Sequence, residues 1–262
     1  MRTAYETLIV KVDDGIVTVT LNRPEQMNAM NPQLIGEMLE VLDEIAWDEE
    51  LCVVVFTGAG AAFSSGLDLK WSRGKAGLRS LAGLRTYQEG IIALQEKLRL
   101  FPRPTVAAVN GWALALGFWL AMLCDFVVVA DDARLGVPQI KGGGHPAGGS
   151  IKAMAEFVPH RFAVYHLLTG EDITGPEAER LLMVNKCVPK EQLMDEAYAL
   201  ARKMKGIDAL SVRFVKRSFW RAKQLPYAAD TIELEAVAGG QLANLRNAID
   251  AARREVPGAP AR

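Results

Sequence analysis

The sequence predicts an α/β protein with a sheet-based core in its first half and helices in its second half. Short runs of β-branched and apolar residues crowd the first half, whereas the pattern beyond Ser150 is almost wholly helical. Such segregation indicates strands that pack together and a helical module that follows them. With 262 residues, 50% of them hydrophobic, the chain is long enough for one large core or two modest ones.

The first predicted elements form a β-hairpin. Residues 7–12 and 16–21 are β-branched runs, and Asp13, Asp14 and Gly15 separate them. An Asp-Gly pair between two such runs is typical of a tight hairpin turn. We therefore expect two paired antiparallel strands.

A helix and a buried strand come next. Residues 32–47 predict a helix that Asn31 can cap and that has Pro32 in its first turn. Apolar residues recur on one face of it at helical spacing: Leu34, Met38, Leu42 and Ile45. The continuous apolar run of residues 51–57 is typical of a strand buried on both faces, and residues 58–66 then predict a loop.

The middle of the chain alternates weak and strong periodicity. Residues 73–83 are rich in glycine and predict a mobile surface segment, whereas residues 84–100 regain helical spacing. Strand, helix and strand follow in quick order over residues 105–109, 117–124 and 126–130. A loop with five glycines follows over residues 141–149.

Charge and cysteine usage exclude several classes of protein. Lys and Arg number 30 against 31 Asp and Glu, so the net charge of −1 provides no basic field for nucleic acid or an anionic membrane. The cysteines lie far apart without paired spacing, which argues against a disulfide framework or a metal site: Cys52, Cys124 and Cys187. No secretory signal begins the chain, and no apolar run reaches membrane-spanning length. We expect a cytoplasmic protein.

Two junctions share one pattern that could carry chemistry. Residues 53–57 run into a small-residue turn at 63–68, and residues 106–109 run through Gly111 to Gly117. Main-chain N–H groups at a turn entering a helix lack helical partners and favour negative charge. Two such turns facing one another would form a two-donor oxyanion hole; alternatively, they are ordinary tight α/β turns.

The residues around these junctions resemble signature blocks of the crotonase superfamily, which includes enoyl-CoA hydratases and isomerases. The blocks cover residues 21–30, 56–70, 109–125 and 168–178, and the resemblance spans residues 5–224. Within the superfamily the sequence is most similar to hydroxycinnamoyl-CoA hydratase-lyases, through residues 109–112 and 150–155.

The resemblance implies a spiral of repeated ββα turns, with C-terminal helices that cross to a neighbouring subunit in trimers or dimers of trimers. It divides the chain into a spiral core over residues 1–200 and a helical oligomerisation segment over residues 201–262. Apolar residues on the helices of that segment are more than a peripheral tail can bury alone: Phe214, Ile232, Leu234, Val237 and Leu242.

The resemblance also implies an acyl-CoA thioester as substrate. In this family the thioester carbonyl lies between two peptide N–H groups, which fall on Leu67 and Leu116. Leu116 occupies a position where the family usually has glycine. Its N–H is kept, but the added side chain would narrow the acyl pocket or, if the backbone needs a positive φ there, shift the hole. CoA would be part of the substrate, and no metal or redox cofactor is implied. Adenine and pantetheine are expected along two segments that include Gln26, Met27, Ala29, Ser65, Leu67, Asp68, Leu69 and Lys70.

The sequence departs from the family at the groups that transfer protons. Hydratases of the family use two glutamates, and these positions fall on Trp119 and Gln139. Neither side chain can act as a general base, and losing a positioned acid or base typically costs about 10² to 10⁴ in rate. Gln139 is either a hydrogen-bonding pocket residue or a group that positions water or a substrate carbonyl.

His145 is the substitute that the sequence offers, because an imidazole titrates near neutrality and lies here in a glycine-rich loop. It could equally be a solvated surface group. Asp68 is expected to cap a helix, and His160 and His166 to be structural. Two functions stay open: an acyl-CoA lyase, isomerase or hydrolase with a relocated proton shuttle, or an acyl-CoA binding protein without turnover.

Overall fold

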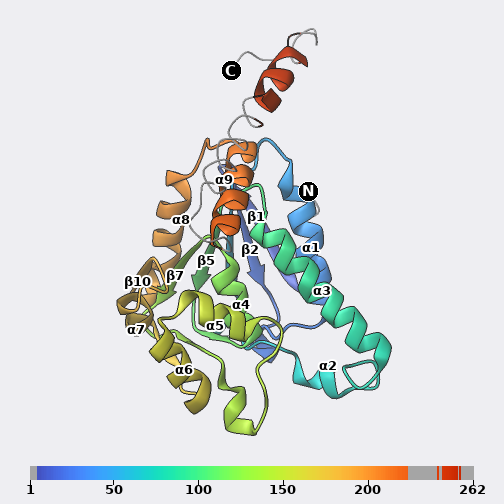
Figure 1. The fold of residues 1–262 in the computed structure, drawn as a ribbon, viewed down its shortest axis with the longest axis vertical. Coiled ribbons are helices and arrows are strands. Elements are labelled where there is room, and N and C mark those ends of the chain that lie inside the picture. Colours follow the sequence, from blue (N-terminus) through green and yellow to red (C-terminus); the bar gives the residue numbers. More distant parts are fainter. Residues whose placement is uncertain (1–4, 224–240, 242–243, 253, 255–262) are drawn as a thin grey trace.

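The computed structural model describes residues 5–223, 241, 244–252 and 254, and two sheets form its core. The larger sheet has six strands in the order β1-β2-β3-β5-β7-β10 (Figure 1). They are β1 (Leu8–Asp13), β2 (Ile16–Leu21), β3 (Val53–Gly58), β5 (Thr105–Val109), β7 (Phe126–Ala130) and β10 (Lys186–Val188). The smaller sheet has the order β4-β6-β8-β9. It comprises β4 (Ala62–Ser64), β6 (Trp112–Leu114), β8 (Arg134–Gly136) and β9 (Ile173–Thr174).

The predicted hairpin is confirmed. Strands β1 and β2 pair antiparallel with Asp13 opposite Ile16, which leaves Asp14 and Gly15 as the turn. Both turn residues have positive φ, 48° at Asp14 and 75° at Gly15. These angles match the mirror-image turns that follow the twist of paired strands.

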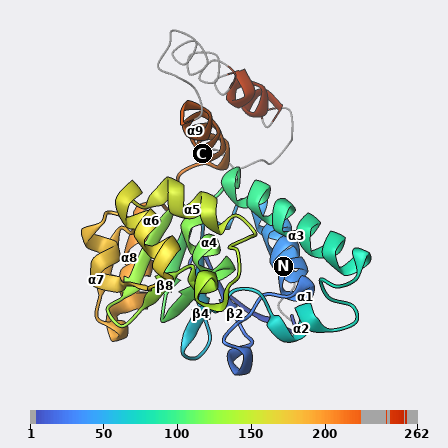
Figure 2. The ribbon, with the colours of Figure 1, turned by 60° about the horizontal axis from the view of Figure 1, so that its bottom comes forward.

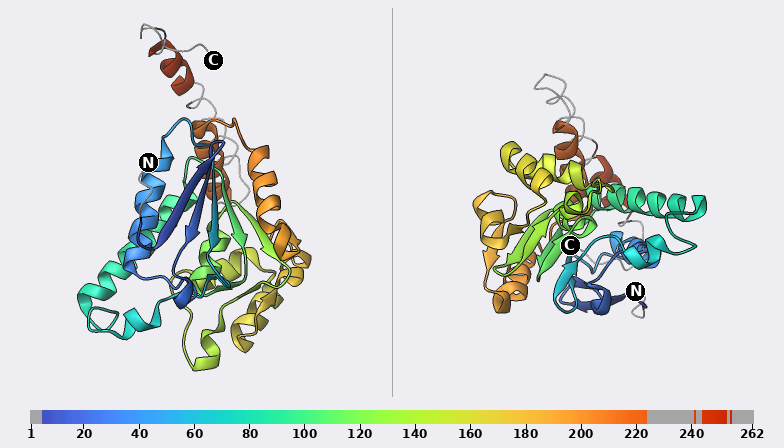
Figure 3. Two further views of the ribbon diagram at one scale, coloured as in Figure 1. Left: turned by 180° about the vertical axis from the view of Figure 1, so that it is seen from behind. Right: turned by 90° about the horizontal axis from the view of Figure 1, so that it is seen from below.

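The rest of the larger sheet is parallel, from β2 through β3, β5 and β7 to β10. Every residue of β3 and β5 is buried, as the continuous apolar run over residues 51–57 predicted for β3. Figure 3 shows the strands fanning out, with α1 on one side and α8 on the other. Parallel strands need this cover because both of their faces are apolar.

A repeat of long strand, short strand and helix organises the chain. Each of β3, β5 and β7 runs directly into a short strand of the smaller sheet, namely β4, β6 and β8. Helices α2 and α3 follow β4, and α4 follows β6. This arrangement is the ββα spiral expected from the resemblance. The predicted loop over residues 58–66 is corrected, because it contains β4.

The helices of the described residues surround these sheets (Figures 1 and 2). Their bounds are α1 (Pro32–Ala46), α2 (Leu69–Arg73), α3 (Leu81–Arg99), α4 (Leu116–Leu123), α5 (Ser150–Phe157), α6 (His160–Thr169), α7 (Gly175–Arg180), α8 (Leu193–Lys203) and α9 (Ala209–Ala222). Short 3-10 turns occupy Pro24–Gln26, Pro138–Gly142 and Lys190–Gln192. Asn31 caps α1 as predicted, since its Oδ1 accepts from the Leu34 N–H at 2.9 Å.

Two sequence-based expectations are corrected in the helical regions. Helix α3 begins at Leu81, earlier than the predicted start at residue 84, because Ser80 caps it and accepts from the Gly83 N–H at 3.0 Å. The almost wholly helical pattern predicted beyond Ser150 also contains two short strands, β9 and β10. Strand β10 is only three residues long and joins the larger sheet by pairing with β7.

Helix α9 packs against α3 and α5, as Figure 2 shows. Its Trp220 ring contacts Phe157 of α5 edge-on, with the ring centroids 6.4 Å apart. Phe214 is half-buried on α9; the other apolar residues predicted for oligomerisation lie outside the described residues: Ile232, Leu234, Val237 and Leu242. Within the described ranges, no helix has the length and apolar character that crossing a membrane requires.

Candidate active site

A buried asparagine joins the first loop of the candidate site to the turn after β3. Asn28 has a φ of 54° and is fully buried. Its side-chain amide donates to the carbonyl oxygens of Ala59 and Ala62, at 2.9 and 2.7 Å. Its Oδ1 accepts from the Arg23 N–H at 2.8 Å. Because these bonds are buried or partly buried, they fix the loop over residues 23–30 to the edge of the smaller sheet.

The first candidate N–H donor, Leu67, lies beside this loop. Met30 and Leu67 form an isolated parallel bridge. In it the Met30 N–H donates to the Gly66 oxygen at 2.6 Å and the Asp68 N–H donates to the Met30 oxygen at 2.9 Å. This pattern turns the N–H of Leu67 itself away from Met30. That N–H has no hydrogen-bond partner among the described residues.

The second candidate donor, Leu116, begins helix α4. Its N–H also lacks a partner in the described part of the chain, as the first N–H groups of a helix do. The preceding residue, Ala115, has φ 52° and ψ −112°, an arrangement that normally requires glycine. The positive φ therefore falls on Ala115 and not on Leu116. Strain of this kind costs about 1–3 kcal/mol and is typical of functional sites.

The two turns lie against each other. A Cβ added at Gly66 would lie 2.7 Å from the Leu114 oxygen and 3.1 Å from the Leu116 amide nitrogen. A Cβ added at Gly117 would lie 2.1 Å from the Ser64 oxygen. Glycine at both positions is what allows the start of α4 to approach the end of β4 so closely. The unpartnered N–H groups of Leu67 and Leu116 thus belong to adjoining turns.

Asp68 caps a helix as predicted, and it also forms an ion pair. Its Oδ1 accepts from the Trp71 N–H at 2.9 Å at the start of α2, and its Oδ2 lies 2.8 Å from the Arg23 guanidinium. Burial alone would raise the pKa of Asp68, but the hydrogen bond from Trp71 and the Arg23 charge hold that pKa below its usual value. A carboxylate held ionised in this way is a poor proton donor.

The residues proposed for CoA come together along one edge of the site. The Ser65 N–H donates to the Met27 oxygen at 2.9 Å, and the Ser65 hydroxyl donates to the Gln26 oxygen at 3.4 Å. Ala29 is buried beside them, whereas four of the candidates are exposed: Gln26, Met27, Leu69 and Lys70. The two segments predicted to hold CoA therefore form one continuous surface with the Leu67 turn.

Gln139 follows the strand that pairs with the second turn. The Ala115 N–H donates to the Gly136 oxygen at 2.8 Å, and Gln139 comes three residues after that glycine. The Oε1 atom of Gln139 is buried without a hydrogen-bond partner among the described residues. A buried acceptor in this state is costly unless a ligand or water donates to it. This geometry fits both roles that the sequence left open for Gln139.

His145 lies exposed in the glycine-rich loop, and its side chain makes no hydrogen bond with another described residue. The loop returns to the site just before it, because the Gly144 N–H donates to the Gln139 oxygen at 3.0 Å. His160 is exposed on α6. His166 is buried there and its Nδ1 bonds the Glu171 oxygen at 2.9 Å, which is a structural contact.

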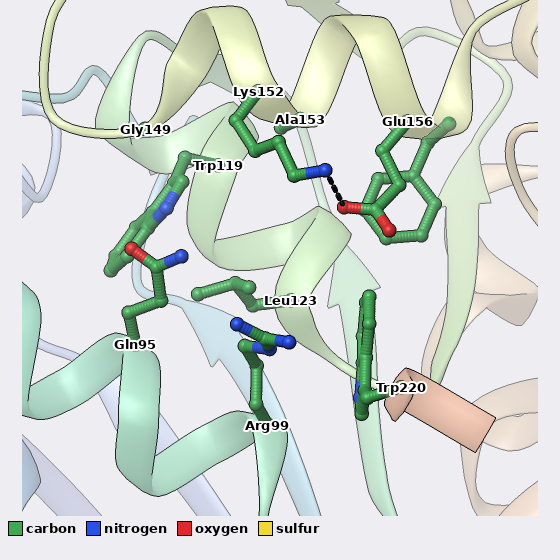
Figure 4. Close-up of a pocket in the computed structure, with 10 residues that line it drawn as sticks. Gln95, Arg99, Trp119, Leu123, Gly149, Lys152, Ala153, Glu156 and Trp220 are labelled. Carbon is green, nitrogen blue, oxygen red and sulfur yellow. Dashed lines mark ion pairs between the residues drawn. The ribbon is translucent and has the colours of Figure 1, made fainter. Parts of the chain in front are cut away.

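Trp119 lies on α4 one turn after Leu116 and is only 1% exposed. Its indole edge packs under the glycine-rich loop, since a Cβ added at Gly149 would lie 2.3 Å from its Nε1 atom. Trp119 also lines a small pocket that opens to solvent (Figure 4). The other lining residues come from α3, α4, α5, α9 and the loop before α5: Gln95, Arg99, Leu123, Gly149, Lys152, Ala153, Glu156, Phe157 and Trp220.

Sequence reasoning missed this pocket. Gln95 and Arg99 are four residues apart, as are Lys152 and Glu156, so each pair shares one face of its helix. This spacing is visible in the sequence alone. Which face meets which neighbouring helix depends on the packing of α9, and no local pattern in α3 or α5 indicates it.

Metal and thiol chemistry have no assembled site in the described part of the chain. No three His, Cys, Asp or Glu side chains within it are placed to hold a metal ion. The cysteines are free thiols, and burial raises the pKa of Cys124, with a further contribution from the Asp125 charge. A buried thiol held protonated is unreactive.

Comparison with known proteins identifies the family. The sequence model of the enoyl-CoA hydratase/isomerase family matches residues 11–244. The chain belongs to this family. It is 36% identical to a hydroxycinnamoyl-CoA hydratase-lyase of Pseudomonas fluorescens over 235 residues, which cover 85% of this chain and 81% of the relative.

Comparisons with two further enoyl-CoA hydratases support the same family assignment. A probable enoyl-CoA hydratase of Mycobacterium tuberculosis is 34% identical over 83% of this chain and 82% of its own length. The crystal structure of an enoyl-CoA hydratase from Bacillus anthracis superposes with a TM-score of 0.82 at 27% identity, covering 90% of both chains. The crotonase fold and superfamily predicted from the sequence are thus confirmed.

Proposed function

We propose that this enzyme binds the carbonyl oxygen of an acyl-CoA thioester between the N–H groups of Leu67 and Leu116 and stabilises the thioester enolate there. The observation that supports the proposal is the pair of unpartnered N–H groups at two adjoining turns. As negative charge moves onto the thioester oxygen, each fixed donor typically contributes about 10² to 10³ in rate. The strained Ala115 fits this role, because it orients the Leu116 peptide before substrate arrives.

The CoA portion would lie along the segments that contain Gln26, Ser65 and Lys70, which form one surface with the Leu67 turn. CoA is then part of the substrate. Enolate chemistry of this type moves protons and, in hydration, adds water across the double bond, with hydroxide at the β carbon and a proton at the α carbon. It needs no metal or redox cofactor.

Proton transfer must use a group other than the two glutamates of the family, because Trp119 and Gln139 stand at those positions. His145 is our candidate. It lies one residue after the Gly144–Gln139 hydrogen bond, and several neighbouring glycines with positive φ shape the loop around it: Gly143, Gly148 and Gly149. Gln139, with its unpartnered Oε1, would position a water molecule or another donor for the reaction.

A panel of CoA esters tests the proposal. Enoyl-, hydroxyacyl-, β-ketoacyl- and aryl-propenoyl-CoA esters are incubated with the enzyme and followed by mass spectrometry, while calorimetry measures binding of each ester. We expect binding of at least one class and conversion of it to product. Binding without any product would leave an acyl-CoA binding protein and exclude the enolate chemistry. Absence of both at millimolar ester would overturn the acyl-CoA site.

A further inference from the structure

The pocket beside Trp119 contains a cation that pairs with no acidic group of the described residues. Arg99 extends into it from α3 (Figure 4). Among the described residues, the guanidinium of Arg99 has one contact, stacking 4.8 Å from the centroid of the Trp220 ring, and neither a hydrogen bond nor an ion pair. A guanidinium carries five N–H donors in a planar fork that matches a carboxylate.

The carboxylate of Glu156, the acidic residue of the pocket lining, is already matched by two lysines. Its Oε1 lies 3.0 Å from Lys223 Nζ and its Oε2 lies 3.5 Å from Lys152 Nζ. The side chain of Glu156 is 11% exposed, so these bonds hold it in place. Three charged side chains line the pocket, namely Arg99, Lys152 and Glu156. Because Glu156 already pairs with Lys152 and with Lys223, Arg99 is the cation left for a ligand.

The remaining walls are apolar or neutral. Trp119, Leu123, Phe157 and Trp220 surround the space, and Gln95 adds amide donors beside Arg99 (Figure 4). Such a lining suits a group with an apolar body and an anionic end. The polar side chains come from α3 and α5, on opposite sides of that space.

Trp119 links the pocket to the helix that carries the second candidate N–H donor. Trp119 belongs to the first turn of α4, since its N–H donates to the Ala115 oxygen at 2.9 Å. It is thus one helical turn from the Leu116 N–H. An acyl chain held at Leu116 would have to run past Trp119 for its far end to reach Gln95 and Arg99.

We propose that this pocket holds the far end of the acyl group and that Arg99 selects CoA esters whose acyl chain ends in a carboxylate. This inference rests on the proposed acyl-CoA site. It assigns to the chain a substrate class, the CoA monothioesters of short dicarboxylic acids, and names Arg99 as the residue that determines it.

A matched pair of ligands tests the inference. trans-2-Hexenoyl-CoA and trans-2-hexenedioyl-CoA have equal chain length and differ in ending with a methyl group or a carboxylate. Calorimetry on the wild-type protein should show the second ester binding about tenfold or more tightly, the scale of one hydrogen bond between charged groups. Arg99→Gln should bring the ratio of the two dissociation constants close to one. Arg99→Lys should keep part of the preference, because it keeps the charge.

Arg85→Gln is the matched control, because Arg85 lies exposed on the same helix, pairs with Glu89 at 2.7 Å and does not line the pocket. It should retain the full preference. Equal binding of both esters by wild type, or an unchanged ratio in a folded Arg99→Gln protein, would overturn the inference and leave the proposed function intact. Failure of both esters and the wider panel to bind would instead overturn the acyl-CoA site and this inference with it.

Discussion

Leu67 and Leu116 contribute main-chain N–H groups to the candidate site, so their side chains can vary without loss of the donors. The constraint falls on their neighbours. Gly66 and Gly117 have no room for a Cβ, and Ala115 takes a conformation that favours glycine. The family resemblance predicted the two donor positions. It considered a positive φ at Leu116, whereas the structure has the positive φ at Ala115, one residue earlier.

Gln139→Glu should raise the hydratase activity of the enzyme. If the two N–H donors function and only the acid or base is absent, wild type should hydrate crotonyl-CoA poorly. The variant should gain roughly 10²-fold, the low end for a positioned acid or base, because Trp119 still replaces the second glutamate. The loss of absorbance of the enoyl thioester measures the rate.

Gln192→Glu, an exposed change in a 3-10 turn, is the control and should gain nothing. A Gln139→Glu protein that still binds CoA esters but shows no gain would contradict the prediction. The cause would then be an acyl pocket reshaped by Leu116 and Trp119, and the native substrate would have to differ from simple enoyl esters.

His145→Ala should reduce the native reaction, once the ester panel reveals it, by about 10² to 10⁴, the usual contribution of a positioned acid or base. The reason is that His145 is our candidate for the proton transfer that Trp119 and Gln139 cannot perform. Steady-state kinetics on the converted ester gives the measurement. His160→Ala, which removes another exposed histidine, should leave the rate unchanged. Full activity in the His145→Ala enzyme would rule out its role.

At the scale of elements, the contact between α4 and β4 determines whether the two turns face each other. Gly117→Ala places a Cβ 2.1 Å from the Ser64 oxygen, so α4 must move away. We expect the free energy of unfolding to fall by about 3 kcal/mol, at the upper end of overpacking effects. The binding of CoA esters should weaken as well.

Gly36→Ala is a matched change in α1, where no atom lies within 4 Å of the added Cβ. It should raise the free energy of unfolding by about 0.5–1 kcal/mol through helix propensity. Urea denaturation measures both variants. Equal effects at Gly117 and Gly36 would show that the contact with β4 is not as tight as the structure has it.

The residues just before β1 are attached to α1 through the buried carboxylate of Glu37. Burial opposes ionisation, but the side chain and main chain of Thr7 and the Glu6 N–H donate to the carboxylate and hold the pKa of Glu37 below 4.5. Because the folded-state pKa is the lower one, the ionised group adds stability above pH 4.5, and this stability is lost as the pH falls through the folded-state pKa.

Glu37→Gln should therefore lower the free energy of unfolding at neutral pH and make the remaining stability less sensitive to acid below that pH. Urea unfolding over a pH series tests this, with exposed Glu25→Gln as the control. Curves for Glu37→Gln and wild type that run parallel down to acid pH would contradict the linkage.

The sequence predicted the elements that carry their own local signals. The Asp14-Gly15 turn, the Asn31 cap and the apolar run of β3 each specify structure within a few residues. The sequence did not predict the strands β4, β6 and β10. Each is three residues long, which is too short to show a periodic pattern, and each forms by pairing with strands distant in the sequence. The sequence did not indicate the proposed role of Arg99 for a related reason. Arg99 stacks on Trp220, which follows it by more than a hundred residues in the sequence.

At the scale of the whole molecule, α9 leaves apolar surface uncovered. Val215 is 67% exposed and Phe219 is 56% exposed on it. Together with the family resemblance, this surface predicts a trimer-based assembly, because the exposed face needs a neighbouring subunit to cover it. Light scattering should give the mass of three or six chains, and a monomer at micromolar concentration would contradict the prediction.

The parallel order of the larger sheet also determines how the chain can fold. Strands β1 and β2 meet through a two-residue turn, so the hairpin can form within microseconds. Every later pairing, from β2·β3 to β7·β10, must first close a long loop that contains other elements, and the entropy of that closure slows it. During synthesis the hairpin leaves the ribosome with an open strand edge long before β10 exists. Chaperone demand should therefore be greatest in that interval.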